Sequence, residues 1–252
     1  MAVNILDRYG IKEVADVTFY ELNDAGERGA PVLYLDTLKV STTEQTAENT
    51  SARGGKGNPE LIMWDYGKEI TVNLEDALFS AKSMAIMYGA NPADETDFHA
   101  QTKIVKTVHV ASIVDGKVST QAGSITVPAE AHYYDADGKD LGTAKTEEAV
   151  YCTFDLEVEG QEIVISAEKF PGSYYITGDT YARSENSGKD EFFQFIIPKA
   201  KVLSEVTLTM EAEGDPSTFS MNLKVLRPKD GQMMKLVKYS LKGTDASEEE
   251  QG

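Results

Sequence analysis

Cysteine is nearly absent from this chain of 252 residues, since Cys152 is the single one. One cysteine cannot form an intrachain disulfide, and a thiolate zinc site would need most of its ligands from other residue types. The sequence therefore indicates synthesis in a reducing compartment. Long hydrophobic runs are missing too, because no stretch approaches the ~20 apolar residues of a membrane-spanning helix. The N-terminus has no basic region followed by an apolar run, so we expect neither Sec-dependent export nor a membrane anchor.

Basic residues are scarce relative to acidic ones. Lysine and arginine number 24 against 42 aspartates and glutamates, which gives a formal charge of −18. Affinity for nucleic acid depends on cations that neutralise phosphates, so this composition argues against DNA binding. It leaves open that DNA passes the protein without sticking to it. An acidic surface that only keeps the protein soluble is the plainer alternative.

Motifs for catalysis and metal binding are also missing. The histidines, His99, His109 and His132, lie far apart and lack the HExxH spacing of a helical metal site. Cys152 falls within an apolar strand-like segment, where a thiol behaves as a small hydrophobe more often than as a nucleophile. We therefore expect no enzyme, no metal and no cofactor.

Two loops resemble binding motifs and fail in detail. The segment 135–140 begins like a calcium loop, but Lys139 and Asp140 occupy the positions of an oxygen ligand and the invariant glycine. A plain Asp-Gly turn is the better interpretation. The segment 53–57 resembles a phosphate loop, but Gly57 follows Lys56 where serine or threonine is required. We interpret it as a flexible loop.

Aromatic residues occur in neighbouring positions at three places. Trp64 and Tyr66 flank one residue, and two adjacent tyrosine pairs lie at 133–134 and 174–175. Such groups can stack on sugars, but aromatic residues also favour ordinary strands. Core or subunit-interface positions and a carbohydrate site are both open at this point.

Strand patterns dominate the chain. Alternating or continuous apolar segments predict strands at 14–22, 31–40, 60–66, 69–72, 102–113, 117–127, 149–158, 162–168, 173–182, 191–202, 205–213, 218–226 and 233–241. Asp-Gly or Glu-Gly pairs at 115–116, 137–138 and 159–160 predict tight hairpin turns between some of them. One amphipathic helix is predicted at 75–88, with Leu78, Ala81, Met84 and Ala85 facing the core. The fold class is mainly β, an antiparallel β-sandwich or partly open barrel with one short packed α-helix.

The stretch 41–59 interrupts this pattern. It is polar, rich in threonine and glycine, and almost free of apolar anchors. A loop of this length in a compact domain is usually functional or disordered. We interpret 33–72 as a long hairpin-like excursion with a protruding polar loop, which is mobile in the monomer and ordered by a neighbouring subunit.

Several segments together resemble the major tail tube proteins of long-tailed bacteriophages, especially phages of Gram-positive hosts. They are the opening hairpin with its long loop, the segment 61–79, and the short helix ending at Gly89. Segments 178–183, 192–202 and 208–226 resemble the paired closing strands of such proteins. The resemblance covers about half of the chain. Residues 98–170 lie outside it and suggest an inserted β module within a tube-like domain of residues 1–242, followed by a flexible acidic tail at 243–252.

This resemblance implies a structural virion protein of the phage tail that is made in the host cytoplasm. It implies self-assembly into rings, usually hexamers, that stack through the long loop and contact other tail proteins. Thr46, Arg53, Lys56 and Trp64 are then the candidate subunit-interface residues.

An acidic lumen would repel passing DNA, which would cross it without specific binding. Spacing on one strand face makes Glu157 with Glu159 and Glu211 with Glu213 candidates for the lumen wall. A solvated outer face explains the same spacing equally well. The alternative function is a β-sandwich binding module that recognises a glycan or a host surface protein.

Overall fold

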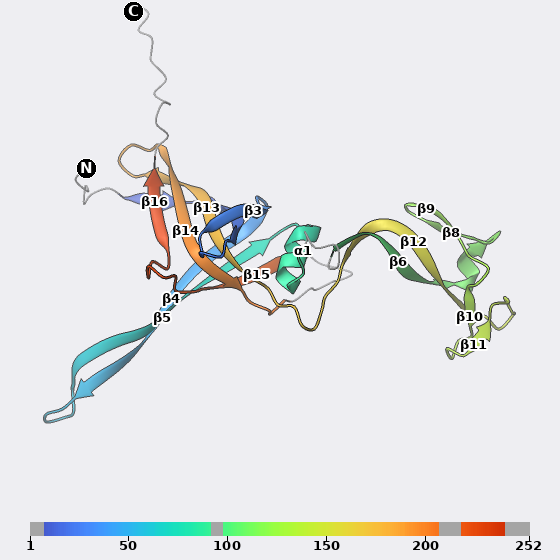
Figure 1. Cartoon of the computed structure of the whole chain (residues 1–252), viewed down its shortest axis with the longest axis horizontal. Helices are drawn as coiled ribbons and strands as arrows, with labels where there is room; N and C mark the ends of the chain where they lie inside the picture. Colours follow the sequence, from blue (N-terminus) through green and yellow to red (C-terminus); the bar gives the residue numbers. More distant parts are fainter. Residues whose placement is uncertain (1–7, 92–97, 207–217, 240–252) are drawn as a thin grey trace, which may run out of the picture. The chain divides into compact units, whose positions relative to one another are not determined.

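The computed structural model describes residues 8–91, 98–206 and 218–239, which fall into two compact units. Unit 1 comprises the described residues of 1–92 and 165–252, and unit 2 those of 93–164. Figure 1 shows that strands make up most of both units and that a single α-helix, α1, is drawn among the described residues.

Unit 1 is built on one nine-stranded antiparallel sheet with the order β3-β2-β13-β14-β15-β5-β4, to which β1 adds at β13 and β16 at β14. The strands are β1 (Tyr9–Ile11), β2 (Asp16–Leu22), β3 (Arg28–Leu35), β4 (Leu38–Arg53), β5 (Glu60–Asp76), β13 (Ser173–Ser184), β14 (Asp190–Val202), β15 (Phe219–Val225) and β16 (Lys235–Tyr239). Strands far apart in sequence therefore pair. The central strands β13 and β14 pair with β1 and β2 from the first part of the chain and with β15 and β16 from the last part.

The core of unit 1 follows from period-two alternation on these strands. Phe19, Ile176, Ile197 and Leu223 are completely shielded from solvent, while their strand neighbours are more exposed. A glycine makes one close contact possible: a methyl group on Gly178 would lie 2.1 Å from the ring of its cross-strand partner Phe195. The sheet curls around this core without closing into a barrel, so the predicted fold class is confirmed.

Helix α1 (Ala81–Tyr88) begins later than predicted, because β5 continues to Asp76. Ser80 is the N-cap: its hydroxyl accepts a hydrogen bond from the Ser83 N–H at 3.0 Å, and the Ser83 hydroxyl accepts one from the Ser80 N–H at 2.9 Å. The helix ends at Gly89, which adopts a left-handed φ of 82°.

The buried face of α1 was predicted only in part. Ala85, Ile86 and Met87 are buried, and Ile86 and Met87 belong to the core of unit 1. Leu78 lies before the helix and is 64% exposed, so its predicted burial is wrong. Helical periodicity was extended over residues that belong to a strand and its turn.

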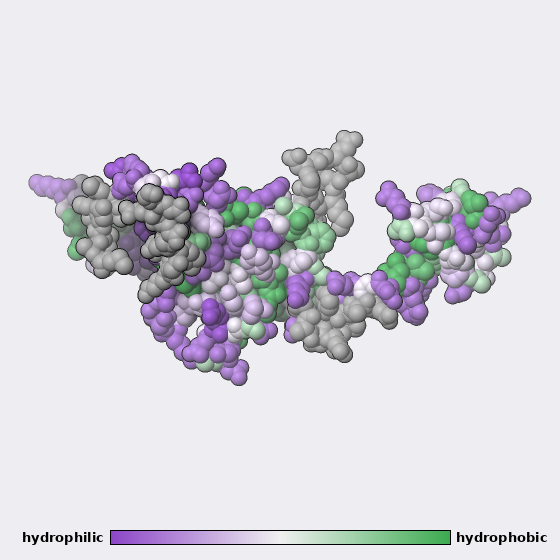
Figure 2. Space-filling view, turned by 90° about the horizontal axis from the view of Figure 1, so that it is seen from above, coloured by the Kyte–Doolittle hydropathy of each residue, from purple (hydrophilic) through white to green (hydrophobic). Residues whose placement is uncertain are grey.

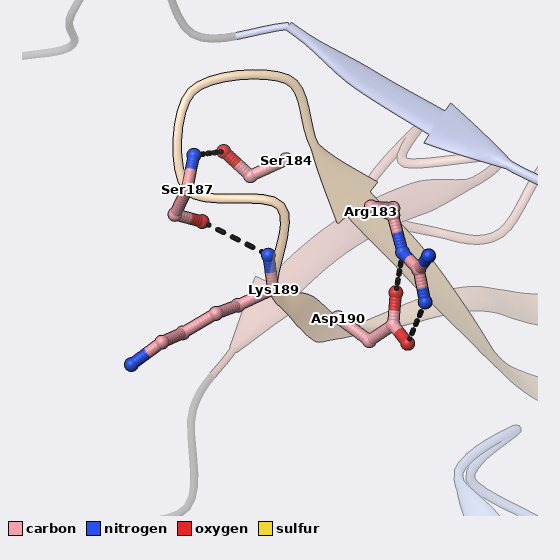
Figure 3. A network of polar contacts seen from close by, with 5 residues as sticks. All are labelled: Arg183, Ser184, Ser187, Lys189 and Asp190. Atoms are coloured by element: carbon pink, nitrogen blue, oxygen red, sulfur yellow. Dashed lines mark hydrogen bonds and ion pairs between the residues drawn. The ribbon is translucent and has the colours of Figure 1, made fainter.

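The turn between β13 and β14 is fixed by polar contacts (Figure 3). The Arg183 guanidinium donates two hydrogen bonds of 2.7 Å to the two carboxylate oxygens of Asp190. This bidentate pair lowers the pKa of Asp190, chiefly through the hydrogen bond from Arg183. Within the turn, the Ser187 hydroxyl accepts a bond from the Lys189 N–H, and Ser184 accepts one from the Ser187 N–H.

Unit 2 contains a four-stranded sheet of order β11-β10-β12-β6 and a three-stranded sheet of order β7-β8-β9. Its elements are β6 (Phe98–His109), a 3₁₀ turn (Val110–Ser112), β7 (Ile113–Val114), β8 (Lys117–Thr120), β9 (Gly123–Thr126), β10 (His132–Tyr134), β11 (Asp140–Gly142) and β12 (Tyr151–Ile163). The small core holds Val110, Ala131, Cys152 and Phe154. Unit 2 thus has apolar packing of its own.

Two of the three predicted tight turns are present. Asp115 and Gly116 both have positive φ between β7 and β8, and a turn at Asp137 and Gly138 joins β10 to β11. The third prediction is wrong, because β12 runs through Gly160 with an irregularity between Glu159 and Glu162. The predicted strand at 205–213 and the tail at 243–252 lie largely or wholly outside the described residues. Within the part of the chain that the structure describes, no helix is long and apolar enough to cross a membrane.

The two ends of the predicted helix give a matched pair of substitutions. Ile86→Ala should lower the free energy of unfolding by about 2–5 kcal/mol, since Ile86 is 1% exposed. Leu78→Ala should change it by no more than about 0.5 kcal/mol, as expected of a surface position. Urea denaturation measures both changes. Equal losses of unfolding free energy in the two variants would contradict the burial of Ile86 and the exposure of Leu78.

Candidate assembly surface

A long hairpin of β4 and β5 is the most conspicuous feature of unit 1, and it extends away from the rest of that unit (Figure 1). The two strands pair in antiparallel register from Leu38 with Asp76 to Arg53 with Glu60. The protruding hairpin is therefore confirmed. The interpretation of 41–59 as a loop is wrong for all but its end, because Ser41–Arg53 belongs to β4. Threonine-rich sequence favours strands even where neither face is buried.

Strand β5 changes character at Gly67. From Ile70 onward, alternate residues are buried in the core of unit 1, whereas every residue from Glu60 to Lys68 is exposed. At the boundary the register shifts, so that Gly67 and Lys68 lie opposite one residue of β4, and Gly67 has a φ of 63°. We call the hairpin beyond this bulge, residues 47–66, the arm.

The arm exposes large apolar side chains that its own unit does not cover. They are Leu61, Ile62, Met63, Trp64 and Tyr66, each more than half exposed. Because side chains alternate along a strand, Ile62, Trp64 and Tyr66 share one face, which we call the aromatic face, and Leu61 and Met63 share the other. Hydrophobic surface is visible at this end of unit 1, partly behind grey atoms, at the left of Figure 2. An exposed run of this kind marks an interaction surface.

The four predicted interface residues all lie on this hairpin. Trp64 is on the aromatic face, opposite Thr50, and Thr46 is at the base of the arm. Arg53 and Lys56 are at the tip, where an Arg53 nitrogen lies 3.4 Å from a Glu60 oxygen. The tip is a turn between two strands, closed by a bond from the Asn58 N–H to the Gly55 carbonyl. No helix follows it to supply the amides of a phosphate loop.

The lumen candidates lie elsewhere. Glu157 and Glu159 are exposed on β12 of unit 2, on the same side of the strand. A Glu157 oxygen lies 3.2 Å from the Lys103 ammonium on the paired strand β6. Glu211 and Glu213 lie outside the described residues.

One tyrosine of each adjacent pair packs against a core. Tyr174 packs against the core of unit 1, with its ring centroid 5.8 Å from that of Phe19, and Tyr133 packs against the core of unit 2. Both are only partly exposed, as are their neighbours Tyr134 and Tyr175 on the opposite strand faces. Core packing, the plainer of the two alternatives, therefore explains one member of each pair.

The candidate groups in the Asp135 loop and at Cys152 are hydrogen-bonded or enclosed by neighbouring residues. The Asp135 carboxylate accepts bonds of 2.9 Å from the N–H groups of Asp137 and Lys139, as expected of a plain turn. Cys152 is buried, and burial raises the pKa of its thiol, which disfavours the reactive thiolate. Over the described ranges, no three His, Cys, Asp or Glu residues gather in a way that could hold a metal.

Comparison with known proteins identifies the family of this chain. The family model of the YomU/Tube protein family matches residues 9–238. The chain belongs to the YomU/Tube protein family. A tail tube protein of Bacillus phage SPR is 21% identical over 218 residues, which cover 80% of this chain and 78% of that protein. The resemblance to phage tail tube proteins is thus confirmed, and a structural role in the phage tail follows.

For this YomU/Tube family member, sequence analysis missed the apolar half of the arm. The segment 60–66 was predicted as a strand, but its residues were not recognised as exposed on both faces. A signal was present in the sequence. Five large apolar residues fall within the six positions 61–66, and the facing segment 48–53 has almost no apolar residues. A buried sheet would require apolar partners on the facing strand.

The arm should be the least protected part of the sheet in the monomer. A two-stranded ribbon without a core is at best marginally stable, so its hydrogen bonds open easily. Amides of Met63 and Asp65 should exchange with solvent orders of magnitude faster than those of Val72 and Leu74 on the same strand. Hydrogen exchange measured by mass spectrometry or NMR tests this, and equal protection along β5 would contradict it.

Proposed function

We propose that this protein assembles with further copies of itself into hexameric rings, which stack to form the tube of a phage tail. Membership of the YomU/Tube family supports the tail role. The single structural observation that supports assembly is the arm with its uncovered apolar side chains. The protein would then reside in the virion tail, contact other tail proteins there, and be synthesised in the host cytoplasm.

The arm has the composition of a subunit contact. Tryptophan, tyrosine and methionine are enriched in interfaces, and the arm carries Trp64, Tyr66 and Met63 in exposed positions. Burying them against a neighbour would stabilise both the contact and the ribbon itself. In this proposal Trp64 is a central contact, whereas Thr46, Arg53 and Lys56 contribute polar contacts at the base and tip.

Charge supports a role as a DNA conduit. A wall rich in carboxylates repels phosphate within about 8 Å at physiological salt, so DNA would pass without being held. Glu157, Glu159, Glu211 and Glu213 remain our candidates for this wall. Subunits of charge −18 also repel one another, and salt should therefore favour assembly by screening that repulsion.

Unit 2 is, in this proposal, a module inserted into the tube-forming unit. Unit 1 holds the two ends of the insertion close together, because Gly89 lies against the backbone of Phe170, so tightly that a methyl group on Gly89 would be 2.5 Å from a Phe170 backbone atom. Adjacent ends are the geometry that tolerates a domain insertion.

The arm is tested with two matched double variants. Met63→Lys with Trp64→Lys should abolish rings and tubes in negative-stain electron microscopy while leaving the thermal transition nearly unchanged, because both residues are exposed. Val105→Lys with Val114→Lys adds the same charge at somewhat more exposed positions of unit 2 and should retain assembly. Tubes formed by the arm variant at wild-type concentration would contradict the proposal.

The role of unit 2 is tested by replacement. A short Gly-Ser linker in place of residues 93–164 should leave the unfolding transition of unit 1 intact and rings still visible. As a control, the arm is shortened instead, by replacing residues 50–64 with a two-residue Asn-Gly turn between the paired Asn49 and Asp65, which should keep the fold and lose the rings. Unfolding of the linker variant would show that unit 2 is part of the tube-forming fold.

A further inference from the structure

An apolar groove opens at the base of the arm. It has a volume of about 670 Å³ and lies between the segment after β1, the beginning of β4, and the strands β14 and β16. Its apolar lining includes Ile11, Val40, Ile70, Phe193, Phe195 and Leu236. Ile11, Val40 and Leu236 are largely exposed, so the groove presents hydrophobic surface that nothing in the described chain covers.

The arm cannot fill the groove of its own subunit. Trp64 lies six residues from Ile70 on β5, which corresponds to about 20 Å along an extended strand. Folding back over that distance would break the ladder between β4 and β5, whose pairs continue to the tip. An arm from a second copy meets no such constraint.

The aromatic face and the groove are both apolar and carry charges of opposite sign. The aromatic face is a narrow ridge of Ile62, Trp64 and Tyr66, with Glu48 opposite Tyr66 on the same face. Two exposed lysines, Lys12 and Lys39, line the groove together with one acidic residue, Glu13, and neither lysine makes an ion pair within the described ranges. In a chain of charge −18, a groove whose lining carries two lysines and one glutamate, and is therefore net positive, suits an apolar ridge that carries a carboxylate.

We infer that the groove at the base of the arm receives the aromatic face of the arm of a second copy of this chain. The inference rests on the proposed self-assembly and names the acceptor surface. Arm and groove are different surfaces, so each copy that donates its arm still offers its groove to the next. Such a heterologous contact propagates until it closes into a ring or continues as a stack.

Photo-crosslinking identifies the acceptor directly. The photoreactive residue p-benzoylphenylalanine replaces Trp64 in the full chain, which is assembled, irradiated, digested and analysed by mass spectrometry. Crosslinks between copies should fall in the peptides that contain Ile11, Val40 and Leu236. The same probe in place of Val105, in unit 2, is the control and should not label these peptides.

The outcomes separate the inference from the proposed function. Tubes whose crosslinks fall on another surface, such as the arm of a neighbour or unit 2, would overturn the inference and leave the proposed assembly standing. If the wild-type protein stays monomeric at high concentration and the probe gives no crosslinks between copies, both the inference and the proposed self-assembly are overturned.

A charge exchange provides a second test. Glu48→Lys and Lys39→Glu should each raise the protein concentration needed for assembly by about tenfold, because each places like charges together in the contact. The double variant has the charge of the wild type and should return to within about threefold of its threshold. Sedimentation measures the threshold, and a double variant as impaired as the two single changes combined would overturn the inference.

Discussion

The structure of unit 1 depends on one strand that is buried along one half and exposed along the other. In β5, Val72 and Leu74 are held by the core, and this anchors a ribbon whose outer half has no core at all. An isolated two-stranded ribbon has little stability in water, so its position depends on the anchored half. The bulge at Gly67 separates the buried half of β5 from its exposed half and allows the ribbon to twist away from the sheet.

Several features of the fold were predictable from local pattern. The strands of unit 1 that pack on one face show alternation, and Phe19, Ile176 and Leu223 lie where the period of two places them. The end of the helix was predictable as well, because Pro92 stands three residues after Gly89. These are cases in which burial on one side leaves a direct trace in the sequence.

Other features could not be predicted, for reasons that are physical. The exposed half of β4 shows no alternation because neither face is buried, so its strand character comes from pairing with β5 alone. The start of the helix was misplaced because Leu78 fits a helical period with Ala81 and Ala85 by coincidence, whereas β5 continues to Asp76 and Leu78 lies exposed before the helix. The groove requires residues from β1, β4, β14 and β16 to meet, and no local pattern encodes that meeting.

The burial of Cys152 has a practical chemical consequence. Because the single thiol of the chain is enclosed by Ala131, Phe154 and their neighbours in unit 2, the folded surface that the structure describes is silent toward maleimides and similar thiol reagents. A cysteine introduced anywhere on that surface would be labelled selectively without removing the native residue. The chain is in this respect already suited to site-specific fluorophores, with which the proposed assembly could be followed by light microscopy.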